Sequence, residues 1–397
     1  MPEPILLGDF NASGPFPRQS RRLRLGLVGG GGIAKVHNWA AHLSQRWRLV
    51  AAAPSSNIDK VRQASADAVL EGCRIYADYQ EMARGGRDGE GQLDAVALTV
   101  PNDRHFEIAR TFLDAGINVM CEKPLTITLE HAADLVERAQ ASGLVFAVAY
   151  PYAAFPMVRQ ARFLVASGAL GAIRQAYVEF VQDFLLTQAT GSGLPGAWRL
   201  DSTRAGAGSS ADVGTHAFQL FEFVTGLHIQ RIRGELHVCG PVKSKSTEDT
   251  FYAFVRAEGG VPGILWGSQV AAGITGGPNF RIIGEKGTLE WNNESPQALK
   301  CLWLDQPMQV ITRGQGRGVS PEAERCTRRG RGNTEGWVEA WGNLYTEFAL
   351  AVAARLDQVF VPPGVLAYPT VADGARGVRF IRAMAASDRA GGAWAEI

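Results

Sequence analysis

The chain has 397 residues, 46% of them hydrophobic, and this size suits an enzyme of two domains. Its 40 basic and 39 acidic side chains give a formal net charge of +1, which provides no general attraction for nucleic acid or a membrane surface. Five cysteines without metal-ligand spacing, no apolar run of about eighteen residues and no secretory signal predict a cytoplasmic protein without a metal site.

The first predicted element is a strand over 23–28 that ends in a glycine-rich turn. Residues 29–34 read Gly-Gly-Gly-Gly-Ile-Ala, and a helical pattern of apolar residues follows. This arrangement is typical of dinucleotide binding, because Gly29 permits a tight turn and Gly31 lets the backbone approach a pyrophosphate. The helix N-terminus would then hold the phosphates. A flexible turn is the alternative, but the flanking strand and helix favour a cofactor site formed by Gly29, Gly31, Gly32, Ile33 and Ala34.

The second strand, over 49–53, lacks the acidic residue that usually follows it in an NAD site. Ser55 and Ser56 come next, and their hydroxyls could bind either a ribose hydroxyl or a phosphate. Lys60 could neutralise a 2′-phosphate by a charge-assisted hydrogen bond. These residues favour NADP over NAD, although a charged first turn is also ordinary in a helix.

Strand and helix patterns alternate up to about residue 150, which predicts a parallel sheet covered on both faces and a Rossmann domain over 23–150. The further elements expected in this part are strands over 94–99, 117–121 and 143–149 and helices over 57–70, 103–115 and 127–141.

The strand over 117–121 leads directly into Glu122-Lys123-Pro124. Ligands of open α/β sheets bind beyond the carboxyl ends of such strands, so Lys123 is a candidate catalytic group. A loop lysine that pairs with Glu122 is the simpler interpretation of these three residues alone.

After Pro151 the pattern changes to that of an α+β domain over 151–397 with a large, mostly antiparallel open sheet. The six arginines within 313–331 predict a solvated surface loop. One face of a late helix, with Trp337, Trp341, Leu344 and Phe348, is expected in the core. The expected elements are a helix over 156–167, strands over 172–185, 229–239, 249–257, 262–272, 279–283 and 287–291, and helices over 336–356 and 371–387.

Asp212 and His216 precede a strongly apolar run. If a helix begins near Ser210, their spacing of four residues places both on one face, where the carboxylate can orient the imidazole as a general base. They could also be an ordinary helix acid and a core histidine.

Four motifs in order resemble the glucose–fructose oxidoreductase / inositol dehydrogenase (Gfo/Idh/MocA) family, and the likeness runs from about Leu23 to Trp394. The motifs are Gly29-x-Gly31-Gly32-Ile33-Ala34-x-x-His37, Thr99-x-Pro101-Asn102-x-x-His105, Glu122-Lys123-Pro124 and Asp212-x-Gly214-x-His216.

The resemblance implies hydride transfer between a secondary alcohol carbon and the nicotinamide. Lys123 would stabilise the developing alkoxide, His216 would accept the proton, and Asp212 would orient His216 or bind a neighbouring hydroxyl. Lysine and histidine could exchange these roles. The resemblance adds Thr99, Pro101, Asn102, His105, Glu122 and Lys123 to the cofactor site.

The chain departs from the family after the strand over 143–149. The carboxylate that inositol dehydrogenases have there is absent from Ala149–Ala154, which puts inositol itself in doubt. Tyr152, Trp198 and Arg199 remain as substrate contacts beside Lys123, Asp212 and His216, since aromatic rings suit a sugar face. Residues 1–22 match nothing and form an N-terminal extension, either disordered or an arm to a neighbouring subunit.

The sequence thus predicts an NAD(P)-dependent dehydrogenase of a sugar, sugar derivative or cyclic polyol, as a homodimer or homotetramer formed through the exposed sheet face. Two alternatives stay open: an enzyme that retains its cofactor, for sugar–sugar hydride exchange or glycoside cleavage, and a regulator that senses a dinucleotide or sugar. The presence of Lys123, Asp212 and His216 argues against sensing alone.

Overall fold

The structure, a computed structural model, describes residues 21–54, 72–87, 91–188, 197–241, 247–362 and 364–397. The chain forms two compact units. The first contains the chain through Thr126 together with Glu130–Ala154 and Trp337–Ala375, and the second contains Ile127–Leu129, Phe155–Gly336 and Arg376–Ile397. The first unit is therefore not continuous in sequence.

The first unit is built on a six-stranded sheet with the order β3-β2-β1-β4-β5-β6, in which all pairs are parallel. This confirms the predicted Rossmann-type sheet. Its inner strands are short and almost wholly apolar, as expected where helices cover both faces. The strands are β1 (Leu23–Val28), β2 (Trp47–Ala53), β3 (Arg74–Ile75), β4 (Ala95–Leu98), β5 (Asn118–Cys121) and β6 (Phe146–Val148).

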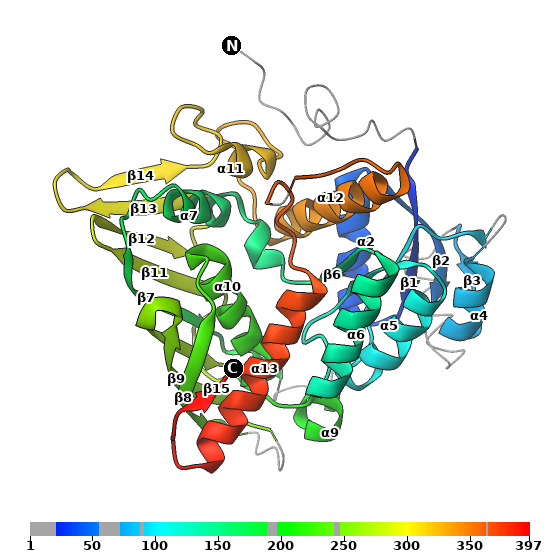
Figure 1. Ribbon diagram of the computed structural model, residues 1–397, viewed down its shortest axis with the longest axis horizontal. Coiled ribbons are helices and arrows are strands. Elements are labelled where there is room, and N and C mark those ends of the chain that lie inside the picture. The colour runs from blue at the N-terminus through cyan, green and yellow to red at the C-terminus, as the bar shows by residue number, and fades with distance from the viewer. Residues whose placement is uncertain (1–20, 55–71, 88–90, 189–196, 242–246, 363) are drawn as a thin grey trace. The chain divides into compact units, whose positions relative to one another are not determined.

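Helices α2 (Gly32–Ser44) and α12 (Trp337–Leu356) lie side by side in this unit (Figure 1). Their apolar residues share one core with strand residues such as Leu25 and Met120. The helix predicted over 57–70 lies outside the described residues. The remaining helices of this unit are α4 (Tyr79–Gly85), η2 (Asn102–Arg104), α5 (His105–Asp114), α6 (Leu129–Ser142) and η3 (Pro151–Ala154).

The predicted core face of α12 is confirmed for Trp341, Leu344 and Phe348, which are buried. The prediction was wrong for Trp337, whose side chain is 39% exposed. Trp337 is the first residue of the helix, so the apolar spacing places it at the end of the buried stripe, where its ring meets the Trp341 ring edge-on.

The second unit is built on a nine-stranded sheet with the order β14-β13-β12-β11-β7-β10-β9-β8-β15. All its pairs are antiparallel except β7 with β10, which agrees with the predicted, mostly antiparallel sheet. The strands are β7 (Ile173–Val181), β8 (Ile229–His237), β9 (Thr250–Ala257), β10 (Pro262–Ser268), β11 (Pro278–Gly284), β12 (Gly287–Asn292), β13 (Ala298–Trp303), β14 (Gln309–Thr312) and β15 (Ala395–Glu396).

Helices α7 and α10 cover one face of this sheet (Figure 1). The strand predicted over 172–185 ends at Val181, because α8 begins at Phe184. The helical elements are α7 (Pro156–Ala166), α8 (Phe184–Gln188), η4 (Ala197–Leu200), α9 (Ser202–Ala205), η5 (Ser210–Gly214), α10 (Thr215–Thr225), η6 (Glu258–Gly260) and α11 (Pro321–Arg325). Helix α13 (Val371–Arg389) begins in the first unit and belongs to the second from Arg376 onward.

The sequence predicted that the arginine-rich segment 313–331 is a solvated surface loop. The structure shows that this prediction was wrong for Arg313. Arg313 is buried and forms an ion pair with Glu335 at 2.9 Å. Its guanidinium also donates to the carbonyls of Arg329 and Asn333 and to the side chain of Gln297. A buried guanidinium needs such a full set of acceptors, and the sequence gives no sign of them.

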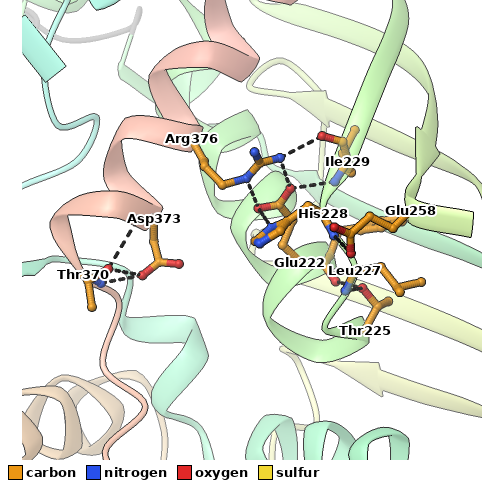
Figure 2. Close-up of polar contacts among 10 residues, drawn as sticks. Glu222, Thr225, Leu227, His228, Ile229, Glu258, Thr370, Asp373 and Arg376 are labelled. Atoms are coloured by element: carbon orange, nitrogen blue, oxygen red, sulfur yellow. Dashed lines mark hydrogen bonds and ion pairs between the residues drawn. The ribbon is translucent and has the colours of Figure 1, made fainter. Parts of the chain in front are cut away.

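Within the second unit, helix α13 is joined to α10 by a two-pronged ion pair (Figure 2). The Nε and Nη2 atoms of Arg376 donate to the two carboxylate oxygens of Glu222, on α10, at 2.7 and 2.6 Å. Arg376 also donates to the Ile229 carbonyl, and the Ile229 N–H donates to Glu222. At the start of the same helix, Asp373 accepts from the Thr370 N–H as in a capping box.

Replacing Arg376 by alanine is expected to lower the free energy of unfolding by about 2–4 kcal/mol, because the largely buried Glu222 carboxylate would lose its two charge-assisted bonds. The matched control is Arg379→Ala, at an exposed position of the same helix, with an expected change within about 0.5 kcal/mol. Urea denaturation, monitored by tryptophan fluorescence, measures the free energy of unfolding of both variants. Equal midpoints for the two variants would contradict the prediction.

Candidate active site

Strand register brings the motifs of the first unit to one edge of the parallel sheet. Val28, the last residue of β1, is paired with Ala53 of β2 on one side and Leu98 of β4 on the other. Leu98 is paired in turn with Cys121 of β5. The residues that follow these strand ends therefore lie along the same carboxyl edge, and they are Gly29, Pro54, Thr99 and Glu122.

The glycine loop leaves open space above the first turn of α2. Gly29 has φ of 109°, and a Cβ added there would lie 2.5 Å from Oγ1 of Thr99, so this position needs glycine. A Cβ on Gly31 or Gly32 would meet nothing within 4 Å. The first turn of α2 carries no acidic residue, and no side chain caps it. A backbone cradle with open space at Gly31 and Gly32 and no acidic residue in the first turn of α2 fits a dinucleotide pyrophosphate.

The loop after β4 is tied to the loop after β5 by a buried histidine. The two ring nitrogens of His105 lie 2.9 Å from the Pro124 carbonyl oxygen and 3.0 Å from the Val100 carbonyl oxygen. Burial lowers the pKa of His105, although the two carbonyls oppose the shift. Thr99 joins the same loop to β1, since its Oγ1 donates to the Val28 carbonyl at 2.9 Å.

Lys123 follows a buried carboxylate that holds its backbone. The Lys123 N–H donates to Glu122 Oε2 at 3.0 Å, and Glu122 Oε1 lies 3.0 Å from Nε2 of His37. Burial acts to raise the pKa of Glu122, but the hydrogen bond with His37 and the charge of Lys123 outweigh it. The pKa of Glu122 therefore lies below its ordinary value, and the group is ionised near pH 7.

Asp212 and His216 lie on a helical segment of the second unit that begins with a π-helical turn. The turn covers Ser210–Gly214, and α10 follows from Thr215. π-helical turns are rare in proteins, and those that occur often lie at functional sites. The sequence predicted a helix start near Ser210 but gave no sign of the π-helical geometry.

The N-terminal end of this segment is capped from a distant part of the chain. The Glu248 carboxylate accepts from the N–H groups of Gly208 and Ser210 at 3.0 and 2.9 Å. A Cβ on Gly208 would lie 1.8 Å from the Glu248 carbonyl oxygen, so the close approach requires glycine. The sequence did not identify Glu248, because only the fold brings it to this helix end.

The Asp212 carboxylate accepts a hydrogen bond from Nε2 of Gln269 at 2.7 Å. Gln269 directly follows β10 and is buried. His216 is also buried, and its ring centroid lies 5.6 Å from that of Phe180 on β7. Gln269 therefore orients the carboxylate of the predicted pair, and sequence reasoning missed it.

The remaining predicted site residues are distributed over both units. Tyr152 lies in η3 of the first unit and is half-buried. Trp198 and Arg199 lie in η4 of the second unit, where the guanidinium lies 4.5 Å from the centroid of the Trp198 ring. Pro101 and Asn102 stand at the start of η2. Ser55, Ser56 and Lys60 lie outside the described residues.

Known proteins match both parts of the chain. Residues 23–150 match the oxidoreductase family with an NAD-binding Rossmann fold, and residues 158–290 match the Gfo/Idh/MocA C-terminal domain. The chain belongs to the Gfo/Idh/MocA family of oxidoreductases. This confirms the resemblance seen in its four motifs, and the chain is an oxidoreductase with an NAD-binding Rossmann domain.

Two similar solved structures are those of an inositol dehydrogenase homolog from Azotobacter vinelandii. The complex with NAD+ is 35% identical with a TM-score of 0.89 and covers 97% of this chain and 100% of that chain. The complex with NADH and myo-inositol is 34% identical with a TM-score of 0.85 and covers 97% and 99%. D-glucoside 3-dehydrogenase of Escherichia coli (strain K12) is 28% identical and covers 62% of this chain and 70% of its own length.

None of the helices within the described residues combines the length and apolar composition that crossing a membrane requires. The same part of the chain holds no group of three or more His, Cys, Asp or Glu side chains arranged to bind a metal ion.

Proposed function

We propose that the protein is an NAD(P)-dependent dehydrogenase that transfers hydride between nicotinamide and a secondary alcohol of a sugar, sugar derivative or cyclic polyol. The main support is the register of β1, β4 and β5, which places the open glycine loop and the Glu122–Lys123 pair on one carboxyl edge. The family membership supports the same function. One relative was solved in complex with NADH and myo-inositol, and another is D-glucoside 3-dehydrogenase.

The bound dinucleotide would supply the hydride acceptor at the nicotinamide. In this proposal Lys123 binds the substrate oxygen and stabilises its negative charge, while His216 accepts the hydroxyl proton. Asp212, held by Gln269, orients His216 or binds a neighbouring hydroxyl. Lys123 and His216 could exchange these roles. Tyr152, Trp198 and Arg199 are the proposed further substrate contacts.

The cofactor site is proposed to consist of the glycine loop and the residues beyond β2, β4 and β5. The pyrophosphate would bind at the first turn of α2, which carries no acidic residue. His105 would act indirectly, because its buried ring lies between the two loops that carry the other contacts. Those contacts are Ile33, Ala34, Thr99, Pro101, Asn102, Glu122 and Lys123.

The choice between NAD and NADP depends on residues beyond β2. Ser55, Ser56 and Lys60 favour NADP, whereas the solved relatives contain NAD+ and NADH. If Lys60 pairs with a 2′-phosphate, Lys60→Ala is expected to weaken NADP binding by about 10- to 150-fold, the loss of one charge-assisted bond, and to leave NAD unchanged. Isothermal titration with each cofactor measures this, with Lys300→Ala, at an exposed position of β13, as control. Equal losses for both cofactors would contradict the NADP preference.

Assembly and location are also proposed. Tyr252, Phe254 and Ile264 are exposed and alternate with the buried residues of β9 and β10, so they form an apolar patch on the sheet face opposite α10. This patch supports a homodimer or homotetramer formed through the sheet. The five cysteines are free, which supports a reducing, cytoplasmic location.

A screen of sugars and inositols with added NAD or NADP, followed by absorbance of the reduced nicotinamide, tests the proposal. Turnover that requires added cofactor supports a dehydrogenase. Hydride exchange between sugars, or glycoside cleavage without added cofactor, would instead support an enzyme with a retained cofactor. Saturable binding without chemistry would support a sensor.

A further inference from the structure

We propose that His37 and Tyr345 are positioning residues for Lys123. Together with Glu122 they form a buried chain of hydrogen bonds that fixes the backbone from which the lysine projects. This inference rests on the proposed function, in which Lys123 is the catalytic cation, and adds two residues to it that do not themselves touch substrate.

This chain of hydrogen bonds has three links, all within the first unit. The Tyr345 hydroxyl lies 2.6 Å from Nδ1 of His37, and Nε2 of the same ring lies 3.0 Å from Oε1 of Glu122. The second carboxylate oxygen accepts the Lys123 N–H at 3.0 Å. His37 and Tyr345 are fully buried, so these polar atoms have no water to replace a lost partner.

The direction of each hydrogen bond follows from the chemistry of its partners. An ionised Glu122 can only accept, so Nε2 of His37 must donate. When the ring carries a single proton, Nδ1 accepts and the Tyr345 hydroxyl donates to it. Burial, with the nearby charge of Glu122, raises the pKa of Tyr345 well above its ordinary value, which keeps the hydroxyl protonated. Tyr345 thus selects the histidine tautomer that the carboxylate requires.

Tyr345, at the far end of this chain of hydrogen bonds from Lys123, is itself held in place. Nε1 of Trp47, at the start of β2, donates to the Tyr345 carbonyl at 2.9 Å. The Trp341 ring packs against His37 with centroids 4.7 Å apart. A helix from late in the sequence therefore supplies part of the support for a lysine that follows β5.

The two oxygens of Glu122 have different tasks, since one accepts a hydrogen bond from the His37 ring and the other accepts one from the Lys123 N–H. Without the His37 donor, a buried oxygen would be left unpaired and the carboxylate would turn toward another donor. Its bond to the Lys123 N–H would then be lost. A displacement of about 1 Å in a catalytic group can cost about 100-fold in rate.

Two substitutions of His37 separate positioning from packing. In His37→Gln the amide nitrogen lies near the place of Nε2 and can still donate to Glu122. In His37→Asn the amide lies near the place of Nδ1 and cannot reach the carboxylate. Both variants lose the ring and its contact with Trp341, so a merely structural role predicts equal effects.

The measurements are kcat, the dissociation constant for NAD, and the Lys123 amide signal in full-length protein labelled with 15N-lysine. The chain has seven lysines, so the spectrum is simple and Lys123→Arg assigns the signal. His37→Asn is expected to lower kcat by about 100-fold, to shift the Lys123 amide upfield and to speed its hydrogen exchange. His37→Gln is expected to keep kcat within about threefold of the wild type and to retain the amide signal, because the donor to Glu122 remains.

Equal effects of the two His37 variants, or an unchanged Lys123 amide in His37→Asn, would overturn the inference. Tyr345→Phe removes one hydroxyl from the same chain, and its expected upfield shift of the Lys123 amide decides the matter if His37→Asn does not fold. A wild type without turnover in the sugar and inositol screen would refute the proposed function, whereas the amide signal would still decide whether the chain positions Lys123.

Discussion

Replacing Lys123 by methionine is expected to lower kcat by about 10²- to 10³-fold, the effect of removing one preorganised donor to a developing oxyanion. Methionine keeps the length of the side chain but loses its charge. The dissociation constant for NAD is expected to change by less than about threefold, because the phosphates would rest on the glycine loop and the first turn of α2. Steady-state kinetics with the best substrate of the screen and isothermal titration with the cofactor provide the two values.

Lys123→Arg serves as the charged comparison. It keeps the positive charge, but its planar guanidinium cannot occupy the place of a compact ammonium, so partial recovery of kcat relative to methionine is expected. Lys300→Met, at an exposed position of β13, controls for the loss of a lysine elsewhere. Wild-type turnover in Lys123→Met would show that the lysine is structural and that another group stabilises the alkoxide.

The sheet of the first unit could be predicted from the sequence because its signals are local. Apolar runs such as 23–28 and 117–121 end at glycine or at charged residues, and the periods of strand and helix alternate along the chain. Once the strands are parallel and in register, the residues after their carboxyl ends must share one edge. The glycine loop and Lys123 could therefore be assigned to one region before any coordinates.

The partners of the site residues could not be predicted in this way. Gln269 and Glu248 lie far along the chain from Asp212, and no spacing rule connects them to it. Tyr345 lies on a helix that the apolar pattern shows only as amphipathic, and the pattern does not reveal that this helix packs on α2. Hydrogen bonds between distant segments depend on tertiary structure, which periodicity does not encode.

Arg313 is a second case in which the sequence could not predict the partners of a side chain, and here the predicted environment was wrong. A run of arginines and glycines is usually solvated, and composition alone gave that prediction. The burial of Arg313 depends on Glu335 and on three further acceptors that converge on one guanidinium. Charge patterns predict the average environment of a segment, whereas a single buried ion pair depends on which acceptors the fold assembles.

The pH dependence of alcohol oxidation is expected to depend on His216, because an imidazole must be neutral to accept the hydroxyl proton. The rate should rise with pH through a single ionisation and then reach a plateau, since the protonated ring cannot act as a base at low pH. His216→Ala is expected to remove this inflection and to lower the rate by about 10²- to 10⁴-fold. The profile of kcat/KM against pH measures both effects.

The position of the inflection alone would not identify the base, because a histidine and a lysine can both titrate over a wide range in a folded protein. The variants make the assignment. His237→Ala, at a partly exposed histidine on β8, should retain the wild-type profile. If His216→Ala also retained the inflection, the proton acceptor would be Lys123 or a group not assigned here, and the roles proposed for the lysine and the histidine would have to be exchanged or abandoned.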